Sequence, residues 1–248
     1  MLEEFNFTTI TLIPDSYNGI TIDTNSIPYI LEEFEKELQN ILQQLENKKL
    51  LWVKLPIEKS HFIPLLTKYD FIFHHCNESD ITLLKKLTID PIIPTARNHT
   101  LGVGVVVIDE GNILVVKERI GQHFKLPGGY IDDNENISTA VVREVKEETG
   151  IDVKFNSIIA LGHFNPLQFG ESNLYIGTIA HPLSKDINII DTDEILEAKW
   201  MKLEDFLEDE EIYLFNKTIV NTALKNNGLK FEHIEMLKGR DIDYELFF

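Results

Sequence analysis

The chain has 248 residues, 43% of them hydrophobic, which is enough apolar surface for one large core or two modest ones. Its formal net charge of −18, from 41 acidic and 23 basic residues, argues against duplex DNA or an anionic membrane as a partner. The single cysteine, Cys76, excludes an intramolecular disulfide, and we see neither a signal sequence nor an apolar run of membrane-spanning length. We therefore expect a soluble, cytoplasmic protein.

The first 90 residues alternate short β-rich runs with helical ones, as in an α/β unit. A long amphipathic helix is predicted over residues 26–49, and a helical turn or two, interrupted by Pro64, follows later. The predicted strands lie at 5–12, 19–23, 50–56, 71–76 and 81–87, and the last two are expected to pair.

The segment DPIIPTARNH has the character of a connector between domains. Pro91 and Pro94 each fix a backbone φ angle and remove a hydrogen-bond donor, which suits a semi-rigid linker. Glycine usage also changes here, because Gly19 is the only glycine before Gly102. We place the boundary near Thr95, which gives one domain over 1–95 and a second over 96–248.

The second domain is expected to be built from strands around a glycine-rich loop and a helix. The loop LPGGYIDD follows two strands joined by a turn at 110–112, and the helix runs to about Thr149. A helical tail over 205–227 is expected to pack back on this domain. The predicted strands lie at 101–109, 113–119, 152–164, 173–181 and 197–203.

Three carboxylates stand close together on the predicted helix. At helical spacing Glu144, Glu147 and Glu148 project from one face within a turn of each other. Such crowding destabilises a helix and raises the pKa values of the carboxyl groups. A hard divalent cation would turn this repulsion into coordination. The alternative is a solvated acidic face on which Arg143 pairs with Glu147 at i,i+4.

The preceding loop favours the first interpretation. Gly128-Gly129, directly after Pro127, permits a close backbone approach that suits a loop carrying amides or carbonyls to a metal–phosphate cluster. Asn136 suits the N-cap of the helix, and Gly150 suits the residue that ends it. We therefore interpret the loop, the helix and the three carboxylates as parts of one site.

This segment resembles the Nudix box, Gx5Ex7REUxEExGU with U an aliphatic residue, with no departures. The positions in register are Gly129, Glu135, Arg143, Glu144, Val145, Glu147, Glu148, Gly150 and Ile151. The resemblance implies a Nudix hydrolase domain, an α/β/α sandwich around a mixed sheet, that cleaves a nucleoside diphosphate linked to another moiety.

The resemblance extends over most of the chain. Residues 50–76 and 163–176 look like those of a two-domain Nudix subgroup that includes plant ADP-ribose/NADH pyrophosphatases and a human protein encoded antisense to a fibroblast growth factor. It implies an acetyltransferase-like fold for the smaller N-terminal α/β domain. Acetyltransferases hold a pyrophosphate with a glycine-containing loop, yet Gly19 is the only glycine there. We interpret this domain as non-catalytic, a structural element or the basis of a homodimer.

The resemblance also assigns roles to the box residues. Glu144 and Glu148 match the most regular metal ligands, Glu147 and the carbonyl of Gly128 match further ones, and the metal is Mg²⁺ or Mn²⁺. Arg143 is better suited to orienting carboxylates, through a bidentate pair with Glu135 or Glu147, than to touching substrate. Glu135 would then hold Arg143 in position without contacting the metal itself.

The implied reaction is attack of a metal-activated water on a phosphorus of the diphosphate. The general base varies in position within the family. We therefore keep Glu147, Glu144, Glu171 and Glu194 as candidates for the catalytic carboxylate.

Several residues near the box are candidates for substrate binding. Arg119, Lys125 and the backbone of Gly129 flank the loop and would contact phosphates, although charged residues at strand ends are often simply solvated. Phe164 and Tyr175 would stack on a base or ribose, although aromatic residues in strands are more often core. The same two interpretations apply to Phe169.

The first expectation for the substrate is ADP-ribose or NADH, giving AMP and a phosphorylated product. Pro166 lies 15 residues beyond Ile151, near the proline spacing of ADP-ribose enzymes. Alternatives are hydrolysis of oxidised nucleoside triphosphates, a regulatory protein with weak turnover, and an acyltransferase acting through the N-terminal half. No nucleic acid and no membrane are expected as partners.

Overall fold

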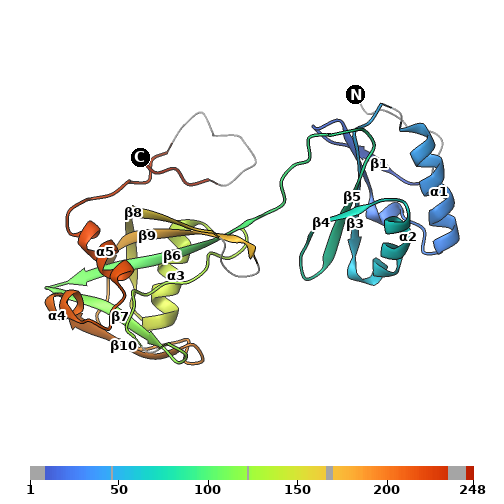
Figure 1. Ribbon diagram of the computed structural model, residues 1–248. Helices are drawn as coiled ribbons and strands as arrows, with labels where there is room; N and C mark the ends of the chain where they lie inside the picture. Colours follow the sequence, from blue (N-terminus) through green and yellow to red (C-terminus); the bar gives the residue numbers. More distant parts are fainter. Residues whose placement is uncertain (1–8, 46, 122, 166–169, 234–243) are drawn as a thin grey trace. The chain divides into compact units, whose positions relative to one another are not determined.

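The computed structural model describes residues 9–45, 47–121, 123–165, 170–233 and 244–248. The chain divides into two compact units, Met1–Arg97 and Asn98–Phe248 (Figure 1). The division falls in the same connector as the boundary expected near Thr95. Among the described residues, no helix has both the length and the apolar character needed to cross a membrane.

The first unit contains a five-stranded mixed sheet with the order β1-β2-β3-β5-β4. Strands β2 and β3 are parallel, because α1 connects them, and the other pairs are antiparallel. The expected pairing of the last two strands is confirmed. The strands are β1 (Leu12–Pro14), β2 (Gly19–Ile22), β3 (Leu50–Pro56), β4 (Ile72–Cys76) and β5 (Asp80–Lys86).

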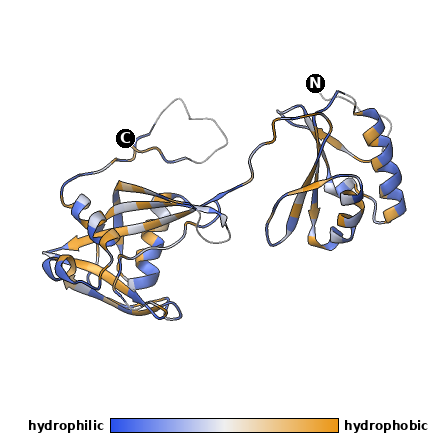
Figure 2. Ribbon diagram, viewed as in Figure 1, coloured by the Kyte–Doolittle hydropathy of each residue, from blue (hydrophilic) through white to orange (hydrophobic). Residues whose placement is uncertain are grey.

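Helix α1 (Leu31–Gln44) covers this sheet with its apolar stripe. Phe34, Leu38 and Ile41 recur at helical spacing and are fully buried, while hydrophilic residues follow its other side (Figure 2). Phe62 meets Phe34 edge to face, with ring centroids 4.9 Å apart. The remaining helical elements are the 3₁₀ turns η1 (Thr24–Ser26) and η2 (Ile57–Phe62) and helix α2 (Ile63–Lys68).

The second unit is built on a mixed sheet with the order β10-β7-β6-β9-β8. The central strand β6 runs parallel to β9, and β7 joins it through a tight hairpin at Glu110-Gly111, both of which have positive φ angles. The strands are β6 (His99–Asp109), β7 (Asn112–Glu118), β8 (Val153–Phe164), β9 (Ser172–Pro182) and β10 (Ile195–Lys202).

Helices cover both faces of this sheet. Val103, Val105 and Val107 of β6 pack with α3 (Ile137–Thr149), whereas Val106 packs with the layer formed by α4 (Leu203–Glu208) and α5 (Leu214–Ala223). The part of a central strand that is buried on both faces must be apolar, and the buried residues 102–107 of β6 are all glycine or valine. The expected α/β class with an α/β/α sandwich around a mixed sheet is confirmed.

Several predicted elements were wrong in their bounds, among them the helix predicted over 26–49, which is Leu31–Gln44. The helical tail is two helices, interrupted at Asp209–Tyr213, where the turn places Ile212 in the core. Within the described residues the first strand is Leu12–Pro14, which shares only Leu12 with the expected range 5–12, and residues 1–8 are outside the described part. The position of Ile212 depends on tertiary contacts, which the spacing of hydrophobic residues in the sequence does not reveal.

Candidate active site

Backbone hydrogen bonds fix the glycine-rich loop against strand β6. Val103 N donates to Gly129 O and Val105 N donates to Pro127 O, each at 2.9 Å. Between them Gly128 has a φ of +140°, and a Cβ there would stand 2.0 Å from Val103 O. Glycine alone fits this position, so the loop backbone lies directly against the sheet.

Helix α3 presents the three box carboxylates beside this loop. It begins after Asn136, whose backbone is extended, and ends at Gly150, whose φ is +78°. Ala140, Val141 and Val145 are fully buried against the sheet. The polar side of the same helix therefore holds the carboxylates next to the loop.

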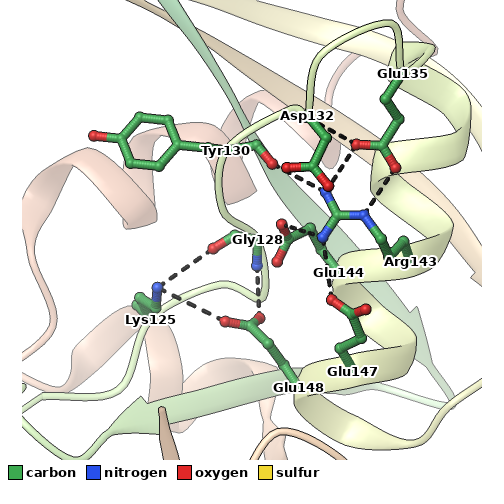
Figure 3. A network of polar contacts seen from close by, with 9 residues as sticks. All are labelled: Lys125, Gly128, Tyr130, Asp132, Glu135, Arg143, Glu144, Glu147 and Glu148. Atoms are coloured by element: carbon green, nitrogen blue, oxygen red, sulfur yellow. Dashed lines mark hydrogen bonds and ion pairs between the residues drawn. The ribbon is translucent and has the colours of Figure 1, made fainter. Parts of the chain in front are cut away.

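Arg143 links four groups of the site (Figure 3). It forms the predicted bidentate pair with Glu135, through two N···O contacts of 2.8 Å, and its Nη2 also donates to Tyr130 O at 3.0 Å. Its Nη1 bridges Glu144 at 2.9 Å and Glu147 at 3.1 Å. The hydrogen bonds from Arg143 lower the pKa of Glu135, and the pKa of Arg143 is raised in return.

The carboxylate of Glu144 lies directly beneath Gly129. A Cβ on Gly129 would stand 2.8 Å from both carboxylate oxygens. Burial raises the pKa of Glu144, although the nearby Arg143 opposes the change. The position of this carboxylate therefore depends on the absence of a side chain in the loop.

Glu148 is a buried carboxylate with few nearby groups that stabilise its charged form. It is 3% exposed, accepts a hydrogen bond from Gly128 N at 2.7 Å, and has Lys125 Nζ 3.9 Å away. Burial raises its pKa to about 8. Lys125 is shared, because it also pairs with Glu118 and lies 3.4 Å from Gly128 O.

A cavity of about 300 Å³ opens over the loop and the helix. Six of the residues proposed from the sequence line it, namely Lys125, Gly128, Gly129, Glu144, Tyr175 and Glu194. Glu147 and Glu148 do not line the cavity themselves. Glu147 contacts Arg143, and Glu148 contacts Gly128.

Tyr175 closes the cavity from the sheet side. Burial, together with the negative charge of Glu148, raises the pKa of its hydroxyl to about 12. A Cβ on Gly104 would stand 1.6 Å from this hydroxyl oxygen, so the ring occupies space that the glycine leaves. Its ring meets Phe215 edge to face, with centroids 5.0 Å apart.

Three proposed residues lie away from the cavity. Arg119 is exposed and its Nε donates to Thr192 O at 2.6 Å, so it holds a loop instead of lining the site. Phe164 packs on Phe215. Glu171 is exposed and does not line the cavity.

Two further residues of the sequence argument, Pro166 and Phe169, lie outside the described residues.

The structure adds three cavity residues with polar side chains that were not predicted from the sequence, Glu118, Tyr130 and Asn173. Glu118 ends β7 and forms an ion pair with Lys125. Asn173, the second residue of β9, donates to Thr100 Oγ1 at 2.9 Å. The only sequence signal was a charged residue at the end of an apolar strand, which is not specific.

The donor set fits a hard divalent cation in its chemistry. Among the residues that the structure describes, no group of three or more His, Cys, Asp or Glu side chains is already arranged to hold a metal ion. The carboxylates contact Arg143 and Lys125 instead. Yet all are oxygen donors, and burial raises the pKa values of Glu144 and Glu148 although Arg143 and Lys125 lie nearby and oppose the change.

Comparison with family models gives a match to each unit. The model described as NUDIX domain matches residues 98–222. A model described as Nudix hydrolase domain matches residues 11–87. The box residues lie within the first of these matches.

Similar proteins cover most of the chain. Nudix hydrolase 8 of Arabidopsis thaliana is 36% identical over 208 residues, 80% of this chain and 56% of that protein, so the match spans little more than half of its length. Human nucleoside diphosphate-linked moiety X motif 6 is 34% identical over 212 residues, 82% of this chain and 67% of that protein. A MutT NUDIX hydrolase structure from Burkholderia pseudomallei, 22% identical, covers 51% of this chain and 98% of its own with a TM-score of 0.44.

The NUDIX match spans half of the chain, and the human relative exceeds 30% identity with two thirds of its length covered. The box and its geometry agree with both. The chain belongs to the Nudix hydrolase family.

Proposed function

We propose that the protein hydrolyses the diphosphate bond of a nucleoside diphosphate linked to another moiety, at the cavity over the box. The observation that carries this proposal is the buried, under-compensated Glu148 beside Gly128 and Glu144. Buried charge of this kind costs stability, and it is retained where a ligand supplies the opposite charge.

Nudix hydrolases generally use divalent metal ions such as Mg²⁺. In this chain Glu144, Glu147, Glu148 and the carbonyl of Gly128 would hold Mg²⁺ or Mn²⁺. The metal would supply charge neutralisation on the diphosphate and a lowered pKa for the attacking water. Arg143 and Glu135 hold the carboxylates in place, because their pair fixes the guanidinium that bridges Glu144 and Glu147.

Among the candidates for the general base, the geometry favours Glu194. It lines the cavity together with Glu144, and its charge contributes to the raised pKa values of Glu144 and Glu148. Glu147 is tied to Arg143, and Glu171 lies off the cavity wall. In the proposed reaction Glu194 accepts the proton of the attacking water as the new oxygen–phosphorus bond forms. The bond from that phosphorus to the bridging oxygen of the diphosphate breaks, and the other half of the substrate leaves with the bridging oxygen on its phosphate.

For the substrate, we propose ADP-ribose or NADH, with AMP and a phosphorylated product. The support is the general resemblance to relatives that act on nucleoside diphosphates and the Lys125 ammonium on the cavity wall. Two alternatives remain part of the test, oxidised nucleoside triphosphates and a regulatory role without turnover.

The N-terminal unit is proposed to be an acetyltransferase-like domain without transferase activity. Gly19 N donates to Asp15 at 2.7 Å, and a Cβ on Gly19 would meet that carboxylate at 2.4 Å. The backbone at this glycine thus faces an anion and is unsuited to a pyrophosphate. A titration of the full chain with acetyl-CoA that detects specific binding would overturn this part.

Pairing of two chains through this unit is the accompanying proposal. The edge strand β4 exposes the apolar side chains of Ile72 (48%) and Phe73 (60%). Light scattering of the full chain is expected to give the mass of a dimer, and the mass of one chain would reject it.

The direct test is a substrate panel with the purified full chain and Mg²⁺ or Mn²⁺. The panel contains ADP-ribose, NADH, FAD, CoA, diadenosine polyphosphates and oxidised dGTP. We expect AMP release from ADP-ribose or NADH, and a decrease of at least about 10²-fold in Glu148→Gln. Preference for oxidised dGTP would name the alternative substrate, and turnover no higher than that of the variant would support the regulatory role.

A further inference from the structure

Two segments that follow α5 extend the sheet of the second unit beyond its edge strand β8. Leu229 forms an antiparallel bridge with Ile158 of β8, through backbone hydrogen bonds of 2.8 and 3.1 Å. Residues 246–248 pair in turn with residues 230–232, through backbone hydrogen bonds of 2.8 to 3.0 Å. Residues 229–232 and 244–248 are called the outer segments below.

Aromatic contacts hold the second outer segment against the sheet. Phe247 meets Phe231 edge to face, with ring centroids 6.2 Å apart, and meets Phe155 of β8 in the same way at 5.7 Å. The backbone two residues after Glu245 is therefore fixed by packing as well as by hydrogen bonds.

Glu245 reaches from this segment to the beginning of α3. Both of its carboxylate oxygens accept from Ser138 N, at 3.2 and 3.3 Å. Ser138 is the second residue of α3, where backbone N–H groups have no partner within the helix. Asn136 precedes the helix, yet its side chain makes no capping hydrogen bond. The cap comes instead from a carboxylate 107 residues away in the chain.

The distribution of charge along α3 makes this contact more valuable. Its first turn contains no acidic residue, whereas Glu144, Glu147 and Glu148 lie in its second half, where only Lys146 is basic in the last turn. The helix dipole favours negative charge at the N-terminus and opposes it at the C-terminus. The box therefore places its carboxylates at the unfavourable end, and Glu245 supplies the negative charge that α3 lacks at the favourable end.

The capped turn also connects the two partners that organise the box. Glu135 lies just before α3 and forms the bidentate pair with Arg143, which bridges Glu144 and Glu147. Ser138 lies between Glu135 and Arg143 in the chain. A contact that fixes the backbone of Ser138 therefore fixes the turn from which both partners extend.

We propose that Glu245 is a positioning residue for the box: it holds the first turn of α3 and, through that turn, the Glu135–Arg143 pair and the carboxylates. The inference rests on the proposed function, because its effect on rate requires turnover at the cavity over the box. Glu245 does not line that cavity. Its removal should therefore change kcat and leave KM unchanged.

The test uses the full chain and three single variants. Glu245→Ala removes the cap, and Glu232→Ala is the matched control, because Glu232 is an exposed glutamate of the other outer segment. Thr139→Glu places an acid in the first turn of α3, three residues after Asn136, where a glutamate is a good capping residue. Thr139 is exposed, so the new side chain has room. The double variant Glu245→Ala/Thr139→Glu measures rescue, with Thr139→Glu alone as its reference.

Three quantities are measured below the melting temperature of every variant. They are kcat and KM for AMP release, Mn²⁺ affinity by electron paramagnetic resonance, and amide hydrogen exchange of residues 137–140. We expect Glu245→Ala to lower kcat and Mn²⁺ affinity about fivefold and to speed exchange in this turn by a similar factor, as for loss of one helix N-cap. Glu232→Ala should match the unmodified protein, and Thr139→Glu should restore the values of Glu245→Ala.

Faster exchange in Glu245→Ala with unchanged kcat and Mn²⁺ affinity would overturn the inference, because the cap would then be structural only. A loss of activity that Thr139→Glu does not restore would also overturn it. These outcomes are separate from the proposed function. A chain that hydrolyses nothing in the panel would refute that function, and Mn²⁺ affinity would still decide the role of Glu245. Equal kcat and equal Mn²⁺ affinity in all variants, with AMP released from ADP-ribose, would refute the inference alone.

Discussion

Among the described residues, each unit buries one long ionisable side chain, and the two differ in how the charged form is satisfied. In the first unit Lys59, 6% exposed, donates to the carbonyls of Thr24 at 2.7 Å and Ile27 at 3.2 Å. In the second unit Glu148, 3% exposed, has one backbone donor, and its pKa is about 8. A buried charge with its partners in place supports the fold, whereas one that lacks them is a candidate for binding a ligand.

The largest expected effect comes from Gly129→Ala. The new methyl would stand 2.8 Å from both oxygens of Glu144, so the carboxylate must move. Displacement of a catalytic group by about 1 Å can cost about 10²-fold in rate. We expect kcat/KM for the panel substrate to fall by that factor with a nearly unchanged melting temperature. Full activity would show that the position of Glu144 does not matter.

Lys59→Met tests the structural side of the comparison. It leaves two carbonyl groups without their donor, which should lower the unfolding free energy by about 2 kcal/mol. Urea denaturation followed by Trp52 fluorescence in a Trp200→Phe background measures this for the first unit. Lys54→Met is the matched control, because the Lys54 side chain is 56% exposed where it pairs with Asp80. Loss of kcat in Lys59→Met would contradict the division of roles.

Glu135→Gln weakens the pair that holds Arg143. The guanidinium then bridges Glu144 and Glu147 less rigidly, and we expect kcat/KM to fall about tenfold, as for supports of metal ligands. Glu197→Gln, which alters a surface contact to Lys199 at 3.6 Å, should have no effect. Equal activities for the two variants would show that the pair between Glu135 and Arg143 does not contribute to activity.

The smallest effect is a gain of stability. The pKa of Glu148 is raised from 4.5 to about 8 by burial, so the native state holds a proton that the unfolded chain releases, and stability is lost as pH rises between these values. In EDTA, Glu148→Gln should therefore stabilise the second unit by about 1 kcal/mol at pH 8, and by less at pH 5. Urea denaturation monitored by Trp200 measures it. A gain that shrinks with rising pH would refute the sign.

Much of the fold was accessible from the sequence because the signals are local. The continuous apolar run of β6, the hairpin at Glu110-Gly111 and the box helix ending at Gly150 all follow from residue type and spacing. The break at Asp209–Tyr213 does not, because Ile212 is held by the core of the second unit.

The candidate site shows the same limit. The box residues lie within 23 positions, so one motif brings them together. Glu118 and Asn173 come from two separate strands and line one cavity only because of the sheet order. No spacing in the chain relates them, and their proximity depends on tertiary structure.

The most direct test of the central claim is Mn²⁺ binding, measured by electron paramagnetic resonance on the full chain and on Glu148→Gln without substrate. We expect the unmodified protein to bind Mn²⁺ and Glu148→Gln to bind it with an affinity at least about tenfold lower. Equal affinities would contradict this expectation, because the buried carboxylate of Glu148 would then make no contribution to metal binding.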